Sequence, residues 1–331
     1  MRRLAIPLLL LGLAAPAAAQ PLKIEVGLGD VSLNKLMFVV AAEAGIYQKN
    51  GLEVAQFITP SAAEVVRRSG VQVPPEFVRN NPGDINIGGG SPMMVGMTTN
   101  AAAVDRVILA TTDTISRFRV VGRPDIARPA DLKGKRWGYS SYGALSHLSA
   151  VVFAKRMGWN PDRDISLIGN AMSIDVLKRG RVDVIVGDEV AWTSALAAGY
   201  KVIVDLNRYR IPMAGSGVNA AKDWLGKNRE AAARFVKSTI DAIALLKTDR
   251  AAAYAAMAKW YGIKDERQAK DIYEQVEKLA AKPYPFVEGI KKVMETYSYH
   301  EMRQHKPADF YDASFVAALD KSGYIDGLYK K

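Results

Sequence analysis

The 331 residues are 49% hydrophobic and 24% charged, as in an ordinary globular protein. The net charge is +11, but basic residues are interspersed with acidic ones, as in Lys264-Asp265-Glu266-Arg267, so we expect no nucleic-acid partner. The absence of cysteine excludes disulfide bonds, a thiol nucleophile, thiolate metal sites and a cysteine-linked lipid anchor.

Residues 1–19 have the pattern of a secretory signal peptide. Two arginines precede an apolar run from Leu4 to Pro16, and the small residues Ala17 to Ala19 fit an A-x-A cleavage site. The apolar run is too short to span a membrane. We therefore expect a soluble periplasmic protein, not a lipoprotein, that begins near Gln20 and carries a net charge of about +9 once the two arginines are removed.

Short β-branched runs alternate with helical patterns from Lys23 to Ala110. Strands are predicted at residues 23–28, 52–58, 84–88 and 107–110, and helices at 33–47 and 92–98. Gly51 ends the first of these helices and Pro92 begins the second. Residues 61–81 contain Pro74-Pro75 and have no clear pattern beyond a short helix at their start.

The middle of the chain repeats this order of elements. Strands are predicted at 136–139, 165–168, 182–186 and 202–205, and helices at 144–157, 173–179 and 190–197. One stretch repeats directly, because Asp84-Ile85-Asn86-Ile87-Gly88 corresponds to Asp183-Val184-Ile185-Val186-Gly187. Alternating strands and helices predict two α/β lobes, each a mostly parallel sheet flanked by helices.

The C-terminal third is predicted to return to the first lobe. A strand at 215–219 is followed by helical patterns at 229–247, 250–260, 266–278, 286–299 and 313–321. We expect residues 20–112 and 212–331 to form one lobe and residues 113–211 the other. Two connections would then let the lobes close on a ligand held between them.

Ligands of open α/β sheets bind at the carboxyl ends of the strands. Ser140, Ser141, Tyr142 and Gly143 lie between a strand and a helix start, where backbone N–H groups suit a small polar or anionic ligand. The alternative role for these serines is helix capping.

Further candidates follow other strands, each with a structural alternative. Asp30 and Asn34 are candidates for ligand contact. Alternatively, Asp30 is an ordinary loop residue and Asn34 caps a helix. Asp113 lies at the expected hinge and alternatively holds the turn. Asp188 and Glu189 are further candidates for ligand contact, but acidic residues are favoured at a helix start in any case. Trp192 could stack on a planar ligand, but aromatic residues in an apolar helix usually belong to the core.

The chain resembles the solute-binding proteins of ABC importers for sulfonates, nitrate, taurine and thiamine precursors, the NMT1/SsuA-like group. The resemblance rests on residues 42–47, 50–54, 83–88, 131–136 and 177–183. It implies the two-lobed type II periplasmic-binding-protein fold, an inner-membrane ABC permease with its ATPase as partner, and a monomer. It also places Ser91 and Met93 on the loop of the first lobe that faces Ser140 to Gly143. The segment 61–81 departs from the family pattern as an insertion.

The resemblance implies binding of a small organic solute without a cofactor or a metal ion. Serine loops and a basic chain favour a sulfonate or carboxylate, whereas Asp30, Asp188 and Glu189 favour an amine or a pyrimidine such as a thiamine precursor. A ligand sensor is a further alternative. A related enzyme family makes the thiamine pyrimidine on this fold with cysteines and histidines. Because this chain lacks cysteine and the common catalytic motifs, we expect that the protein is not an enzyme.

Overall fold

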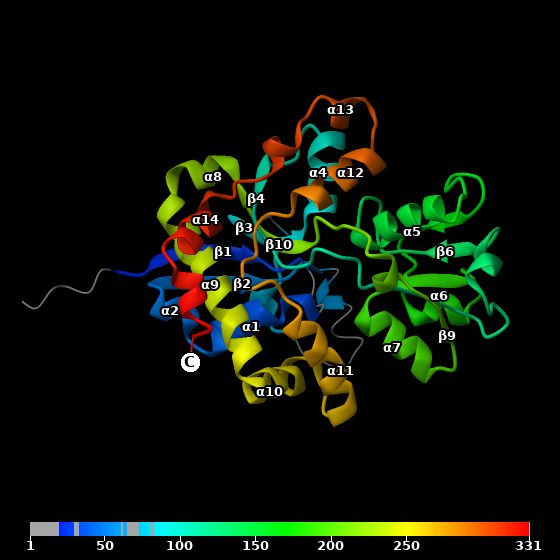
Figure 1. Ribbon diagram of the computed structural model, residues 1–331, viewed down its shortest axis with the longest axis horizontal. Helices are drawn as coiled ribbons and strands as arrows, with labels where there is room; N and C mark the ends of the chain where they lie inside the picture. Colours follow the sequence, from blue (N-terminus) through cyan, green and yellow to red (C-terminus); the bar gives the residue numbers. More distant parts are fainter. Residues whose placement is uncertain (1–19, 30–32, 61, 65–72, 81–82, 331) are drawn as a thin grey trace, which may run out of the picture.

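The computed structural model describes residues 20–29, 33–60, 62–64, 73–80 and 83–330. The expected signal peptide, Asp30 and most of the predicted insertion lie outside these ranges. Two five-stranded sheets lie side by side along the long axis of the molecule (Figure 1). We call the parts of the chain that build them the first and second lobes.

The first sheet has the strand order β2-β1-β3-β10-β4. Its strands are β1 (Leu22–Gly27), β2 (Leu52–Phe57), β3 (Ile85–Gly89), β4 (Arg106–Thr111) and β10 (Ser216–Ala221). β1 pairs in parallel with β2 and β3, whereas β10 runs antiparallel to both β3 and β4. Four of the five strands therefore point the same way.

The second sheet repeats this plan in the order β7-β6-β8-β5-β9. Its strands are β5 (Arg119–Gly122), β6 (Arg136–Gly138), β7 (Ser166–Ile168), β8 (Val184–Gly187) and β9 (Lys201–Asp205). Here the reversed strand is β5, which lies antiparallel between β8 and β9. The predicted α/β fold with two mostly parallel sheets is confirmed, but β5 was missed because its four residues show no alternation.

Helices cover the sheets. In the first half of the chain they are α1 (Leu36–Glu43), α2 (Ile46–Lys49), α4 (Gly90–Thr99), α5 (Leu145–Arg156), α6 (Ile174–Lys178) and α7 (Glu189–Ala197). In the second half they are α8 (Lys222–Lys227), α9 (Arg229–Thr248), α10 (Arg250–Tyr261), α11 (Glu266–Glu277), α12 (Val287–Thr296), α13 (His300–Arg303), α14 (Ser314–Lys321) and α15 (Tyr324–Gly327).

Short 3₁₀ turns join several of these elements: η1 (Leu33–Lys35), η2 (Pro75–Phe77), η3 (Pro129–Leu132), η4 (Leu206–Tyr209) and η5 (Pro307–Phe310). The single helix predicted at 33–47 is divided between α1 and α2, because Gly45 adopts a left-handed φ of 65°. No helix within the described ranges is long and apolar enough to cross a membrane.

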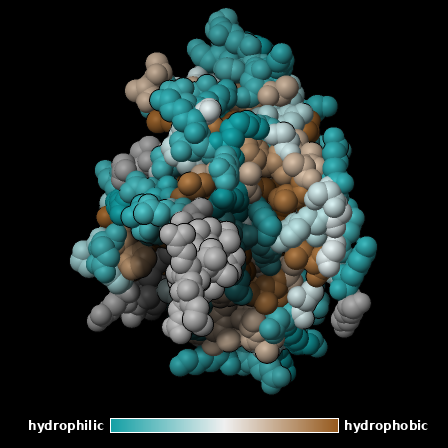
Figure 2. Space-filling model, turned by 90° about the vertical axis from the view of Figure 1, so that its left-hand side faces the viewer, coloured by the Kyte–Doolittle hydropathy of each residue, from teal (hydrophilic) through white to brown (hydrophobic). Residues whose placement is uncertain are grey.

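The core of the first lobe lies between its sheet and helices α1 and α9. Phe235 of α9 stacks on Phe38 and on Tyr47, with ring centroids 6.2 Å and 5.5 Å apart. The outer face of this lobe shows hydrophilic residues along its outline and hydrophobic ones between them (Figure 2). In the core of the second lobe, the ring of Trp137 packs on the ring of Phe153 of α5, with their centroids 5.9 Å apart.

The C-terminal helices do not all pack on the first lobe. α9, α10 and α14 contribute to its core, but α12 contacts both α4 and α5 (Figure 1). Ile290 and Val293 of α12 share one buried cluster with Met94 of the first lobe and Leu148 of the second. Residues 287–297 therefore join the lobes by packing, besides the two chain connections, while the exact lobe boundaries stay a prediction.

An ion pair fixes the start of β8 against β6. The Asp183 carboxylate accepts hydrogen bonds from the Arg136 backbone N–H at 2.9 Å, from Nε at 3.0 Å and from Nη2 at 2.9 Å. These bonds outweigh the effect of burial and lower the pKa of Asp183 to about 2. Asp183 begins the second copy of the repeated stretch, and Arg136 ends one of the segments on which the family resemblance rests.

Asp183→Asn is expected to lower the free energy of unfolding by about 2 kcal/mol at pH 7. A depressed carboxyl pKa stabilises the fold above the unfolded value of about 4, and this contribution is lost as the pH falls toward 2. The difference between variant and native protein should therefore narrow below pH 4 in urea unfolding. Asp175→Asn, at an exposed position of α6, is the control and should change stability by less than about 0.5 kcal/mol. If the difference in unfolding free energy between Asp183→Asn and the native protein did not change with pH, the assigned role of the Asp183 carboxylate would be wrong.

Candidate functional site

A cavity of about 770 Å³ lies between the two lobes, and we call it the interlobe cavity. The first lobe contributes η1, the start of α1, the end of α9 and the segment through α10 and α11. The second lobe contributes β5, α7 and β9 with the residues beside them. The cavity is large enough for a small organic molecule.

The two walls of this cavity differ in polarity. The wall from the first lobe is largely apolar, with Leu36, Met37 and Leu246 among its residues, although Asp265, Arg267 and Glu274 also line it. The wall from the second lobe carries Arg117, Arg119, Glu189, Trp192 and Asp205. Such a cavity suits a ligand with a polar group at one end and an apolar body at the other.

Arg119 lies over the ring of Trp192, with its guanidinium carbon 3.9 Å from the ring centroid. Its Nε is 3.8 Å from a carboxylate oxygen of Asp205, which is too far for a hydrogen bond. The guanidinium makes no hydrogen bond with any residue that the structure describes. Because the stacking fixes the plane of the group, its N–H edge is available to an acceptor in the cavity.

Arg117 instead joins two carboxylates. Its Nη2 is 3.0 Å from Asp113 and its Nε is 3.7 Å from Glu189. Burial lowers the pKa of Arg117, but the two carboxylates outweigh burial, and the net shift is upward. Asp113 and Glu189 are therefore compensated by a protein cation, while Asp188 accepts the Ala191 N–H at 3.0 Å as the N-cap of α7.

The serine loop of the second lobe meets the first lobe directly. Ser91 Oγ donates to the Gly143 carbonyl at 2.7 Å, and Ser91 is fully buried. Ser140 Oγ lies 2.8 Å from Ser146 Oγ, which also accepts the Ser140 N–H at 3.1 Å. Ser141 is exposed, and its hydroxyl has no hydrogen-bond partner among the described residues. Ser91, Ser140 and Gly143 thus take part in protein contacts, and ligand contact by the loop stays a prediction.

An aromatic cluster extends this direct contact. His147 Nδ1 of α5 is 2.8 Å from the hydroxyl of Tyr297, which follows α12. The ring of Tyr142 packs on His147 at 4.9 Å and edge-on against Tyr297 at 5.7 Å. Burial lowers the pKa of His147 to about 4, so the imidazole is neutral at pH 7. Tyr297 could not be assigned from sequence because it is remote from every strand end.

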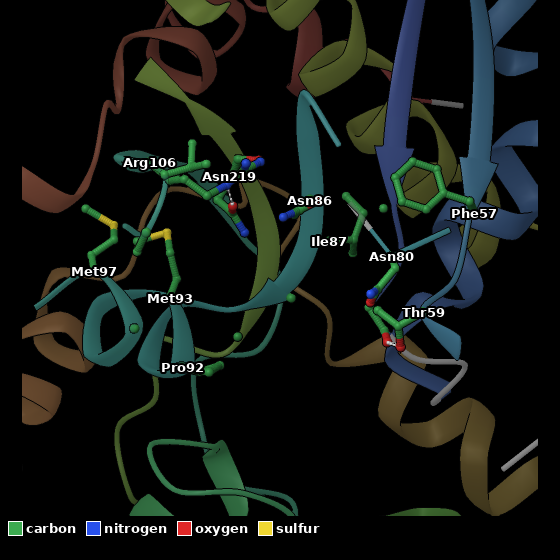
Figure 3. Close-up of a pocket in the computed structure, with 17 residues that line it drawn as sticks. Phe57, Thr59, Asn80, Asn86, Ile87, Pro92, Met93, Met97, Arg106 and Asn219 are labelled. Carbon is green, nitrogen blue, oxygen red and sulfur yellow. Dashed lines mark hydrogen bonds between the residues drawn. The ribbon is translucent and has the colours of Figure 1, made fainter. Parts of the chain in front are cut away.

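A second cavity, of about 420 Å³, lies on the face of the first sheet opposite α1 and α9 (Figure 3). We call it the sheet pocket. Met93 of the predicted set lines it, together with Phe57, Asn86, Arg106 and Asn219.

The structure therefore divides the predicted residues among three places. Asn34, Glu189 and Trp192 line the interlobe cavity, and Asp113 reaches it through Arg117. Met93 lines the sheet pocket, and Asp30 lies outside the described residues. The remaining candidates, apart from the helix cap Asp188, gather at or beside the direct contact: Ser91, Ser140, Ser141, Tyr142 and Gly143.

Arg117, Arg119 and Asp205 are among the cavity residues that sequence reasoning missed, as are the charged residues Asp265, Arg267 and Glu274 of the first lobe. Two arginines separated by one residue in Ser116-Arg117-Phe118-Arg119 could have indicated an extended segment with one basic face. Across the described residues, no group of three or more histidine, aspartate or glutamate side chains is placed to hold a metal ion.

Comparisons with known proteins connect this geometry to a family and a fold. Residues 32–253 match the family described as NMT1/THI5 like. No curated protein matches the chain in sequence.

Several solved structures share the fold at low sequence identity. The periplasmic aliphatic sulphonate binding protein SsuA from Escherichia coli is 16% identical, with a TM-score of 0.62 over 86% of this chain and 97% of that one. The periplasmic nitrate-binding protein NrtA from Synechocystis PCC 6803 is 12% identical, with a TM-score of 0.68 over 92% and 89%. The desulfurization enzyme DSZB is 14% identical, with a TM-score of 0.55 over 91% and 99%. The fold is that of the periplasmic binding proteins.

The burial of His147 predicts that the folded protein loses stability in mild acid. The folded-state pKa of about 4 is below the unfolded value of about 6.5, so protonation favours the unfolded chain and stability falls between pH 6.5 and 4. We expect a loss of about 1–3 kcal/mol across this window in urea unfolding. His147→Gln should remove most of that dependence, whereas the exposed His300→Gln should keep it. An unchanged dependence in His147→Gln would assign the effect to other groups.

Proposed function

The chain belongs to the NMT1/THI5 like family, and from this premise we propose that it is the ligand-capturing component of an ABC-type import system. In this role it binds a small organic solute between its lobes and delivers the solute to an inner-membrane permease with its ATPase. The observation that carries the proposal is the interlobe cavity, where Arg119 stacked on Trp192 faces an apolar wall.

Two lobes with two chain connections supply the motion that capture needs. We assign residues 20–112 and 212–331 to the first lobe and 113–211 to the second. Hinge motion at residues 111–114 and 207–212 then opens and closes the interlobe cavity. The packing of α12 against α4 and α5 restrains the opposite edge, so that closure acts mainly at the α7 and α11 side.

The solute we propose is an organic acid, a sulfonate or a carboxylate, with an apolar body. The unbonded N–H edge of Arg119 matches the oxygen pair of such a head group. The nearby Glu189 does not oppose an anion strongly, because Arg117 compensates its charge. The apolar wall takes the remainder of the molecule. Nitrate-sized anions would leave this wall without a partner.

The carboxylates of Glu189 and Asp205 favour a second candidate ligand, an amine or a nitrogen heterocycle such as a thiamine-precursor pyrimidine. Its N–H groups would bind these carboxylates, and its ring would replace Arg119 on Trp192. The protein would remain a binding protein, as an importer component or as a ligand sensor.

We propose binding without turnover. His147, the histidine nearest to the predicted loop, is buried and bonded to Tyr297, and no nucleophile and base face one another in the part of the cavity that the structure describes. Since DSZB shares the fold, the fold itself does not decide this point. Export through residues 1–19, a periplasmic location and a monomeric state complete the proposal.

Arg119→Gln is expected to weaken binding of a cognate sulfonate or carboxylate by at least tenfold, because a charge-assisted hydrogen bond contributes about 1.5–3 kcal/mol. A thermal-shift screen of benzenesulfonate, butanesulfonate, benzoate, nitrate, putrescine and pyrimidines identifies the class, and calorimetry measures the affinity. The matched control is Arg181→Gln, an exposed arginine of the same lobe that does not line the cavity.

Two results would contradict the organic-acid assignment. Stabilisation by amines or pyrimidines alone would favour the second candidate ligand. Equal affinities of the Arg119 and Arg181 variants would place the head group elsewhere. Recovery of a chemically altered ligand after incubation would overturn binding without turnover.

A further inference from the structure

The sheet pocket is built by the pairing of β3 with β10. The antiparallel register sets Asn86 opposite Asn219 and Gly88 opposite Gly217. Strand alternation places these four residues on the face away from α1 and α9. Their neighbours Ile85, Ile87, Val218 and Ala220 fill the core on the other face. One face of the same strand pair is thus packed, whereas the other has two carboxamides beside a pair of glycines.

Each carboxamide uses its oxygen within the protein and leaves its nitrogen without a partner. Asn219 Oδ1 accepts from Arg106 Nε at 2.6 Å, and Asn86 Oδ1 accepts the Gly83 N–H at 3.0 Å. Neither Nδ2 donates a hydrogen bond to any residue within the described ranges, although Asn219 is only 4% exposed. Both side chains line the sheet pocket (Figure 3). Both Nδ2 atoms therefore reach the open space of the pocket, where they are available to an acceptor.

The positive charge of Arg106 in this pocket also favours a ligand group that accepts hydrogen bonds. Arg106 is buried, and its remaining N–H groups bond the carbonyls of Gly83, Asp84 and Asn219. Arg106 itself lines the pocket and bonds to the Asn219 carboxamide, and no aspartate or glutamate is among the described residues that line the pocket. Burial lowers the pKa of Arg106 to about 10, and the charge of the nearby Asp84 carboxylate offsets part of this effect.

Space for the rest of a molecule comes from glycines. A Cβ at Gly88 or at Gly96 of α4 would meet no atom within 4 Å. Phe57, Met93 and Met97 form apolar walls around this space (Figure 3). The volume of about 420 Å³ accommodates a single ring or a short chain.

The second sheet shows that this arrangement belongs to the first lobe alone. The residue of β8 that corresponds to Asn86 in the repeated motif is Ile185. Ile185 is fully buried in a cluster with Leu177 of α6 and Ala195 of α7. The same strand position is core in one lobe and a hydrogen-bond donor in a pocket in the other.

We propose that the sheet pocket is a second ligand site, which binds a small organic molecule by placing a carboxylate or similar oxygen acceptor against Nδ2 of Asn86 and Asn219. The apolar part of this molecule lies against Phe57, Met93 and Met97. The site is separate from the interlobe cavity, and the inference does not depend on the proposed function.

The test uses 4-fluorobenzoate as the probe and follows its ¹⁹F NMR signal during titration of the full chain. Gly96→Leu fills the pocket and should weaken binding at this site at least tenfold. Gly226→Leu is the matched control, because Gly226 is also a helical glycine with no atom within 4 Å of its Cβ position, but it lies outside the pocket. It should leave the affinity unchanged.

A second pair of variants tests the donors without filling the space. Asn219→Asp keeps the oxygen that accepts from Arg106 but replaces the free N–H₂ group with an oxygen, and Asn86→Asp does the same beside Gly83. Each substitution should weaken the binding of 4-fluorobenzoate at least tenfold. 4-Fluorobenzylamine, which has no acceptor, should not bind to the native pocket.

The Arg119→Gln variant separates the two cavities. If 4-fluorobenzoate also enters the interlobe cavity, Arg119→Gln should remove one of two binding steps and Gly96→Leu the other. No binding to the native chain at millimolar probe would overturn the second site. Binding that Arg119→Gln abolishes while Gly96→Leu and Asn86→Asp leave it intact would also overturn it, without affecting the proposed function.

Discussion

The pairing of β5 between β8 and β9 is the constraint on which the interlobe cavity depends. β5 enters the second sheet from the first lobe, antiparallel to its neighbours, and its register sets Arg119 opposite Gly187 on one side and Asp205 on the other. Gly187 ends β8 just before α7 begins. Arg119 is therefore delivered to the carboxyl ends of the neighbouring strands, within reach of Trp192 on α7. A parallel β5 would reverse its direction and place the arginine at the opposite edge of the sheet.

The opposite edge of the lobes is held by different chemistry. Ser91 bonds to the Gly143 carbonyl, and Tyr297 bonds to His147, so α4, α5 and the end of α12 are joined through buried polar contacts. A shared apolar cluster lies beneath them. Because buried hydrogen bonds are costly to break without replacement, relative motion of the lobes is expected to be smallest here and largest at the cavity. Burial at this edge also gives His147 its low pKa, so we expect this edge to be sensitive to acid.

The two cavities differ in how their charges are balanced. In the interlobe cavity, Arg117 is already paired with Asp113 and Glu189, and Arg119 has an unbonded N–H edge although an Asp205 oxygen lies 3.8 Å from its Nε. In the sheet pocket, Arg106 is bonded mainly to carbonyls, and carboxamide donors face the space. The first arrangement suits a ligand that exchanges with solvent through the proposed hinge motion of the lobes. The second lies within one sheet and does not require such motion.

The sequence by itself determined the α/β fold class, the repeated order of strands and helices, and the family. Hydrophobic periodicity, glycine stops and the similarity of Asp-Ile-Asn-Ile-Gly to Asp-Val-Ile-Val-Gly are local signals. The sequence also indicated the strand ends where Asn34, Ser91, Glu189 and Trp192 lie. Only the tertiary structure decided which of these residues face a cavity. Ser91 and Glu189 follow equivalent strands, yet one bonds across a closed contact and the other lines open space. Arg119, Tyr297 and the pairing of Asn86 with Asn219 depend on strand register and helix packing between segments far apart in the chain. Those relations are set by the packing of the whole fold, and no local pattern encodes them.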